Sequence, residues 1–315
     1  MTIDVSRRRG LVLIRSGASS LHGSFTTAER DFDFALSSFV DQPPDADGAL
    51  FVHRVAGPKW TGLLATIRAH WDLVSRYDYV WLPDDDLRTT AQTVNRLFER
   101  SRQFGLDLAQ PALTRDSYFS HLITFEHAPF LLRFTNFIEL MAPLVSLTQL
   151  ERMLPTLEGA LSGWGLDFVW PRLTSLGRVA ILDDALITHT RPVGGPSYAH
   201  SQAAGLSPVE ELHLNAARYG IDSFVQLNLG AIARNGDRLW LTGGTAGAKG
   251  LLDVLIEFAG SLPAPESEIA RYRDRHVAFA RNEPLGEVPS RAFIGPALEL
   301  HLARLQARTQ ERDPA

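Results

Sequence analysis

The feature that most constrains the fold is an alternation of short apolar runs with longer amphipathic segments over residues 10–113. The apolar runs end in turn-forming residues and predict buried strands at 10–17, 48–55, 77–82 and 106–113. The segments between them predict helices at 26–40, 61–76 and 90–105. Strands that alternate with helices favour an α/β domain with a largely parallel sheet.

The rest of the chain departs from this alternation. Residues 115–175 read as longer strands, open to antiparallel pairing, followed by a helix, so we expect a mixed, Rossmann-like sheet flanked by helices. Beyond residue 200 the pattern predicts a helix, a hairpin with Asn235-Gly236 at its turn, and two amphipathic helices from Glu266 onward. We place a catalytic core domain at 8–200 and a mainly helical extension at 201–315.

Composition excludes several classes of protein. The net charge of -5 provides no general attraction to nucleic acid or to an anionic membrane. The chain has no cysteine, which excludes disulfides, thiolate metal sites and cysteine nucleophiles. The apolar run Leu11–Ile14 is too short for a signal peptide, and no run is long enough to span a bilayer. We therefore expect a cytoplasmic protein without a transmembrane segment.

Three adjacent carboxylates, Asp84, Asp85 and Asp86, follow the predicted buried strand Tyr79–Leu82. Two unit charges about 5 Å apart repel by about 3 kcal/mol at an effective dielectric of about 20, so another group must offset the repulsion. The first turn of a helix predicted over Arg88–Phe104 would offset part of it, and a divalent cation would offset more. A solvated turn that caps the helix is the alternative interpretation. Ligands of open α/β sheets bind beyond the carboxyl ends of the strands, which is where the triplet is expected.

Further polar residues follow other predicted strands or glycine-rich turns. Lys59 follows the second strand, where it can meet a diphosphate as a point charge, or serve as an ordinary surface lysine. In "GWGLD", two glycines around Trp164 allow a close approach to a ligand, and Asp167 follows as a functional acid or a helix cap. His189 ends a predicted strand, and a histidine near an aspartate cluster suits Mn²⁺ or Mg²⁺.

Seven sequence blocks occur in order: "LVLIRSGASSLH", "GPKW", "YDYVWLPDDDL", "LAQPAL", "FIELMAPL", "SGWGLDF" and "HTRPVG". Over residues 8–196 they resemble a bacterial and plant family catalogued as domain of unknown function 707, which is similar in pattern to GT-A glycosyltransferases. The "DDD" block resembles the Asp-any-Asp motif that holds the metal and the donor diphosphate. The "GWGLD" block resembles the segment of inverting galactosyltransferases that carries the acidic base, although only one acid, Asp167, stands here.

The resemblance implies a GT-A-like fold and a metal-dependent, inverting transfer of a sugar from a nucleotide-sugar donor, with UDP-type donors favoured, to an acceptor hydroxyl. Asp167 would remove the acceptor proton, and a Mn²⁺ or Mg²⁺ ion would neutralise charge on the departing diphosphate. The expected metal ligands are Asp84, Asp86 and His189. The expected donor-binding residues are Arg15, Ser16, Lys59, Asp85 and Arg191, and the expected acceptor-side residues are Trp164, Gly165 and Glu139.

Other interpretations of the same residues stay open. His189 can instead hydrogen-bond a loop while Arg191 contacts phosphate. The chain can also be a non-catalytic nucleotide-sugar or carbohydrate-binding protein, with Asp167 only a cap. A metal-dependent phosphohydrolase or nucleotidyltransferase is the third possibility, because aspartates and Mg²⁺ serve those reactions equally well.

Overall fold

The structure, a computed structural model, describes residues 10–192, 206–241, 246–262, 264–283 and 285. The strands are β1 (Gly10–Ser16), β2 (Asp33–Ser38), β3 (Val52–Arg54), β4 (Tyr79–Trp81), β5 (Leu87–Arg88), β6 (Leu108–Leu113), β7 (Phe130–Thr135), β8 (Leu144–Ser146), β9 (Val179–His189), β10 (Asn228–Ala233) and β11 (Arg238–Trp240). The α-helices are α1 (Lys59–Ala69), α2 (Trp71–Val74), α3 (Ala91–Phe104), α4 (Leu147–Met153), α5 (Leu166–Val169), α7 (Pro208–Tyr219), α8 (Ala246–Gly260) and α9 (Glu266–Arg281). Short 3₁₀ turns lie at His22–Ser24, Leu122–Thr124, Leu154–Leu157, Trp170–Leu173 and Leu176–Arg178.

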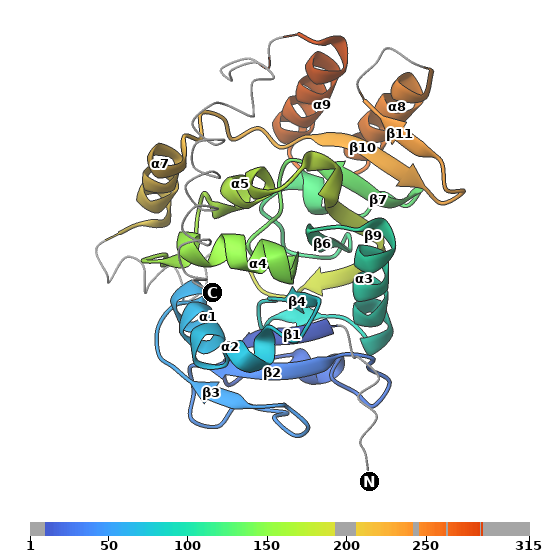
Figure 1. The fold of residues 1–315 in the computed structure, drawn as a ribbon. Coiled ribbons are helices and arrows are strands. Elements are labelled where there is room, and N and C mark those ends of the chain that lie inside the picture. The colour runs from blue at the N-terminus through green and yellow to red at the C-terminus, as the bar shows by residue number, and fades with distance from the viewer. Residues whose placement is uncertain (1–9, 193–205, 242–245, 263, 284, 286–315) are drawn as a thin grey trace, which may run out of the picture.

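One mixed sheet runs through the molecule in the order β11-β10-β7-β9-β6-β8-β4-β1-β2-β3, and β5 pairs separately with β9. The pairs among β1, β2, β3 and β4 are parallel, as is β6 with β9, whereas β7, β8, β10 and β11 pair antiparallel with their neighbours. Figure 1 shows β1 to β3 at one end of the molecule and β10 and β11 at the other. The prediction of an α/β fold with a mixed sheet flanked by helices is confirmed.

Helices cover the sheet with their apolar faces. The helix α1 packs on β1 and β2, α3 packs on β6 and β9, and α8 packs on β11 and α9. The ends of α3 follow from local chemistry, because the Thr90 side chain accepts a hydrogen bond from Thr93 N and Gly105 adopts the left-handed conformation at φ 61°. Among the described residues, no helix has the length and apolar composition needed to cross a membrane.

The predicted helix over 26–40 is wrong, because β2 occupies part of this segment. The reason is visible in "DFDFALSS": Phe32 and Phe34 alternate with acids at the strand's start, and both rings are buried. That alternation has the period of a strand rather than of a helix. The segment pairs in parallel with β1 and adds a strand where a crossover helix was expected.

The helix predicted to begin at Arg88 begins instead at Ala91. Leu87 and Arg88 form β5, which pairs antiparallel with His189 and Thr188 at the end of β9. The first turn of α3 therefore lies beyond β5 and does not adjoin the aspartate triplet. The expectation that the helix N-terminus offsets the repulsion within the triplet is corrected by this pairing.

The predictions for the second half of the chain are largely confirmed. The hairpin of β10 and β11 turns at Asn235-Gly236, with Gly236 at φ 93°. The hairpin joins the main sheet, because β10 pairs with β7. Of the two helices predicted from Glu266 onward, the first is α9, and the second falls outside the described residues.

A bulge in β9 redirects the strand in mid-course. Pro111 of β6 pairs with Leu182, but the next residue, Ala112, pairs with Leu186, so Asp183, Asp184 and Ala185 are extra on β9. Asp183 turns inward and accepts hydrogen bonds at 2.9 Å from the guanidinium of Arg133, and neither side chain is exposed to solvent. Asp184 turns to the other side and accepts from Arg100 Nε at 2.8 Å.

We predict that Asp183→Asn lowers the free energy of unfolding by about 3–5 kcal/mol, because it leaves the charge of Arg133 buried without its counter-ion. Urea denaturation followed by circular dichroism measures this. The matched control is Asp116→Asn, which removes the partner of Arg88 in an ion pair where both side chains are more than half exposed. Its stability should be unchanged within error. Equal losses in the two variants would contradict the role given to the buried pair.

Candidate active site

The aspartate triplet is positioned by the strands on both sides of it. β4 ends at Trp81, and Pro83, which has no N–H to donate, follows shortly after. Asp84 N then donates to Met141 O at 2.8 Å, and Asp86 O accepts from Thr190 N at 3.1 Å. The triplet is therefore held between the segment before β8 and the end of β9, at the carboxyl end of β4.

Each aspartate has its own positively charged or ionisable partner. Lys59 Nζ lies 2.6 Å from Asp84 Oδ1, and Arg191 Nη1 lies 3.4 Å from Asp85 Oδ1. His189 Nε2 lies 3.4 Å from Asp86 Oδ2. The residues therefore come together from α1, from the β4–β5 turn and from the end of β9. The repulsion between the three adjacent carboxylates is therefore offset, at each carboxylate, by a neighbouring side chain of the protein.

The three carboxyls differ in their acidity. Burial raises the pKa of Asp84, and the charge of Lys59 only partly counteracts that effect. Burial also raises the pKa of Asp85, against the hydrogen bond that it accepts from Gly17 N at 2.8 Å. Burial acts in the same direction on Asp86, but the hydrogen bond and charge of His189 outweigh it, so the pKa of Asp86 is lowered. Asp86 is thus the member of the triplet that stays ionised most readily.

The His189 ring is oriented by the main chain. Its Nδ1 lies 2.9 Å from the carbonyl oxygen of Tyr118, which can only accept, so Nδ1 carries a proton and Nε2 faces Asp86. Burial acts to lower the pKa of His189, but the hydrogen bond and charge of Asp86 outweigh it, so the pKa is raised. This orientation matches that of a metal-binding histidine, whose second nitrogen is typically fixed by a carbonyl or carboxylate. A role of His189 as a metal ligand stays a prediction.

The donor set fits a divalent cation in part. Asp86 Oδ1 is buried and has no hydrogen-bond partner among the described residues, as expected of an oxygen kept for a ligand. Asp84, in contrast, is engaged by Lys59, and the described part of the chain holds no group of three acidic or histidine side chains arranged to bind a metal. Mg²⁺ is commonly held by one or two carboxylates together with substrate phosphates. The residues present fit an ion that binds together with a diphosphate.

Lys59 links this cluster to the segment that precedes β8. Besides Asp84, its ammonium group donates to Leu140 O at 2.7 Å and Met141 O at 3.1 Å. Three acceptors match the three protons of the ammonium group, so Lys59 is saturated by protein contacts in this arrangement. The next residue on the amino side of this segment, Glu139, thereby lies close to the aspartate cluster.

Glu139 and Asp167 form the second half of the site. Burial raises the pKa of Glu139 to about 7, and its Oε2 has no hydrogen-bond partner among the described residues. Burial also raises the pKa of Asp167 to about 7, with a further contribution from the charge of Glu139. Ile138 N approaches Asp167 O at 3.5 Å, which places α5 against the Glu139 segment. Both carboxyls can therefore exchange a proton near neutral pH.

Arg15 and Ser16, two of the predicted donor-binding residues, are buried at the end of β1. The Arg15 guanidinium donates to Val55 O at 2.8 Å and Gly57 O at 2.7 Å, and it also contacts Ser37. Burial lowers the pKa of Arg15 to about 10. These hydrogen bonds hold the segment after β3, so the structure brings Arg191 to the triplet but engages the Arg15 guanidinium with β2 and the segment after β3.

Trp164 and Gly165 lie in the loop before α5, and residues of α7 hold that loop. Asn215 Nδ2 donates to Trp164 O at 2.8 Å, and the buried carboxylate of Glu211 accepts from the backbone of residues 161–163. Glu211 and Asn215 were not predicted from the sequence. The available signal was their spacing of four on one helix face that also carries the apolar Tyr219. Tyr118, whose carbonyl orients His189, has no comparable signal, because any residue can supply a carbonyl.

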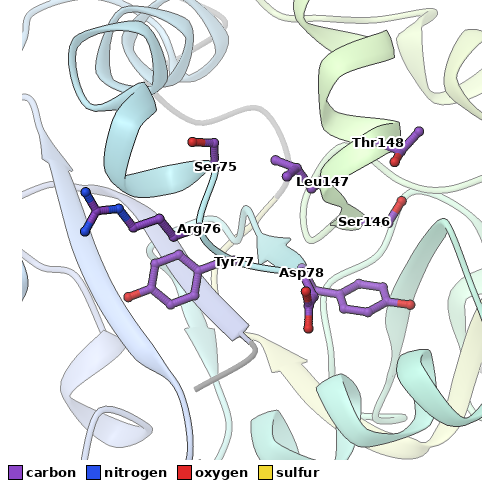
Figure 2. Close-up of a pocket in the computed structure, with 8 residues that line it drawn as sticks. Ser75, Arg76, Tyr77, Asp78, Ser146, Leu147 and Thr148 are labelled. Carbon is purple, nitrogen blue, oxygen red and sulfur yellow. The ribbon is translucent and has the colours of Figure 1, made fainter. Parts of the chain in front are cut away.

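A separate cavity of about 840 Å³ lies at the other end of β4. Figure 2 shows Arg76 and Tyr77 on one side of it, Ser146 and Thr148 on the other, and Asp78 between them. These residues precede β4 or lie where β8 meets α4, whereas the aspartate triplet follows the carboxyl end of β4. None of the predicted site residues lines this cavity.

Several solved structures have a similar fold. TarS 1-349 from S. aureus in complex with UDP-GlcNAc is 10% identical, with 96% of this chain and 92% of that chain covered and a TM-score of 0.39. Glucosyl-3-phosphoglycerate synthase from Mycobacterium tuberculosis, in complex with Mn²⁺, UDP-glucose and phosphoglyceric acid, is 14% identical, with 73% and 85% covered and a TM-score of 0.40. A197 from STIV is 12% identical, with 74% and 93% covered and a TM-score of 0.36.

No curated protein sequence matches the chain. The family model described as "Protein of unknown function (DUF707)" matches residues 38–213. This region includes the aspartate triplet, Glu139, Asp167 and His189, and it spans more than half of the 315 residues. The chain therefore belongs to the DUF707 family.

Proposed function

We propose that the protein is a glycosyltransferase that moves a sugar from a nucleotide-sugar donor to an acceptor hydroxyl. The main observation behind the proposal is that two groups of ionisable side chains lie close together. One is the aspartate triplet with Lys59, Arg191 and His189, and the other is the carboxyl pair of Glu139 and Asp167. Group transfer from a diphosphate needs both, because the departing diphosphate requires cationic contacts and the acceptor requires a base.

The donor diphosphate would bind at the triplet. Arg191 is the partly exposed cation of this cluster, with 38% of its side chain accessible, and it bridges Asp85 and the Ser19 carbonyl. Its planar guanidinium can contact two phosphate oxygens at once. Asp86 and His189 would hold a Mn²⁺ or Mg²⁺ ion, and Asp84 would join them if Lys59 releases it. When bound, this ion supplies neutralisation of charge on the diphosphate. The donor class, a UDP-type nucleotide sugar, follows from the resemblance to GT-A glycosyltransferases.

The acceptor would bind on the side of Glu139 and Asp167. A general base works best when its pKa lies near the working pH, and burial brings the pKa of Asp167 to about 7. The Asp167 carboxylate takes the proton of the acceptor hydroxyl as the oxygen attacks the anomeric carbon. Glu139, Trp164 and Gly165 would line the acceptor side. Attack from the face opposite the leaving diphosphate gives inversion of the anomeric configuration.

The deciding experiment measures turnover of a panel of nucleotide sugars with and without a panel of hydroxyl acceptors. A transferase consumes donor faster when its acceptor is present and forms a glycosylated product. A phosphohydrolase cleaves the diphosphate at the same rate without any acceptor, and a binding protein gives saturable binding without turnover. Product analysis by NMR reports whether the anomeric configuration is inverted.

We predict that UDP-type ligands bind in the presence of Mn²⁺ and lose most of their affinity in Asp86→Asn. The substitution removes the carboxylate whose pKa is lowered and whose Oδ1 lacks a protein partner. Isothermal titration calorimetry measures the affinity, with Asp274→Asn as the control for loss of an exposed acidic residue whose ion pair is with Arg273 of the same helix, α9. Equal affinity in Mn²⁺ and in EDTA would rule out the metal role.

We predict that Asp167→Asn lowers the transfer rate by at least about a hundredfold while donor affinity stays within about twofold. In the wild type, kcat/KM should rise with pH through about 7, because the base acts only when deprotonated. Glu139→Gln should move this rise to lower pH, because it removes a charge that raises the pKa of Asp167. The rise should stay above the range of an ordinary aspartate, since burial is the larger cause. An unchanged rate in Asp167→Asn would refute its role as the base.

A further inference from the structure

A single carboxylate from α7 holds the loop that leads into α5. Glu211 is only 3% exposed, and it accepts four hydrogen bonds from residues 161–163. Leu161 N and Gly163 N donate to Oε1 at 2.9 and 3.0 Å, and Ser162 donates to Oε2 through N at 2.7 Å and through Oγ at 2.5 Å. Three successive N–H groups that point at one anion form a nest, and here a side chain of the same protein fills it.

The same face of α7 shapes the rest of the loop. Gly165 adopts φ 94°, and a Cβ added there would lie 3.2 Å from Leu212 O and 3.0 Å from the Asn215 side chain. Asn215 also donates to the carbonyl of Trp164. The loop backbone thus lies directly on α7 and is fixed at Leu161, Ser162, Gly163 and Trp164 in succession.

This loop leads directly into the residues on the acceptor side. Leu166 N donates to Gly163 O at 2.9 Å, and Phe168 N donates to Gly165 O at 3.2 Å, so the first turn of α5 is built on the loop. Asp167 lies within that turn. A displacement of the loop would therefore shift Asp167 relative to Glu139, because the carbonyls of Gly163 and Gly165 accept the hydrogen bonds that form the turn.

We propose that Glu211 is a positioning residue that sets the loop 161–165 and, through it, the location of Asp167. This inference rests on the proposed function, in which Asp167 is the base. The hydrogen bonds of the Glu211 carboxylate go to residues 161–163, none of which is assigned to the donor. The expected consequence is that Glu211 affects the transfer step and acceptor binding but not donor binding. Misplacement of a reacting group by about 1 Å can cost about a hundredfold in rate.

The test compares Glu211→Gln with Glu210→Gln. The first keeps the shape of the side chain but replaces one acceptor oxygen with an NH₂ group that faces N–H donors. The control removes the same charge from the neighbouring residue, which is exposed and forms a capping box with Ser207, a role that glutamine also serves. We expect Glu211→Gln to lower kcat at least about tenfold, with donor Kd within about twofold, and Glu210→Gln to match the wild type.

Two readouts do not depend on activity. Amide hydrogen exchange at residues 161–163 should accelerate in Glu211→Gln and not in the control. The pKa of the Asp167 carboxyl, followed by ¹³C NMR, should fall from about 7 as the loop loosens and water reaches the group. These readouts test the positioning role even if the wild type proves to have no transferase activity, an outcome that would defeat the proposed function alone.

If exchange, the pKa of Asp167 and kcat all match the wild type in Glu211→Gln, the positioning role is overturned. The positioning role is also overturned if the variant is less stable but all three quantities match the wild type at a temperature where the variant is folded. That result is expected of a contact that only stabilises the fold. Should Glu211→Gln not fold, Ser162→Ala replaces it. That variant removes one of the four hydrogen bonds to Glu211. Smaller changes of the same sign would support the proposal, and the absence of any change would refute it.

Discussion

The buried ion pair of Arg133 and Asp183 is the interaction on which the arrangement of the strands at the site depends. It holds the bulge of β9 inward, and the bulge separates the part of β9 that pairs with β7 from the part that pairs with β5. His189 lies on the part of β9 after the bulge, where it faces Asp86. Arg133 also donates to the carbonyls of Ile123 and Phe125 and to Asn228, so every side of the pair is hydrogen-bonded. A buried pair is tolerable only with such complete satisfaction.

The same polar centre ties the end of the described chain to the sheet. Asn228 of β10 donates to the hydroxyl of Tyr272 at 2.6 Å, and its own N donates to His276 Nε2 at 3.0 Å. Burial lowers the pKa of His276 to about 4, so the ring is neutral and can accept this bond at ordinary pH. The helix α9 is thereby connected through β10 to Arg133. Segments beyond residue 200 thus stabilise the strands that carry the site, and α7 does the same for the loop before α5.

The site separates its carboxyls into two groups by environment. The triplet has a nearby positive or protonatable partner for each acid, and Asp86 keeps its ionised form most readily as a result. Glu139 and Asp167 form no ion pair with a cation among the described residues, and burial shifts their pKa values to about 7. Identical functional groups therefore differ in acidity on the two sides, since their surroundings differ. The segment 138–141 connects the two groups, because Lys59 donates to the carbonyls of Leu140 and Met141 while Ile138 N approaches Asp167 O.

The sequence by itself determined the family, the α/β class and the strand end at which the triplet lies, because these depend on local patterns and ordered blocks. It also indicated the turn at Asn235-Gly236 and the end of α3 at Gly105, where glycines act within a few residues. It predicted a helix where β2 lies and missed β5, since a two-residue strand exists only through its partner on β9. Only the tertiary structure decided which cation meets which aspartate, and that Glu211 fills the nest before α5. Those contacts join residues far apart in the chain, such as Lys59 with Leu140, and their geometry is set by packing rather than by neighbours in sequence.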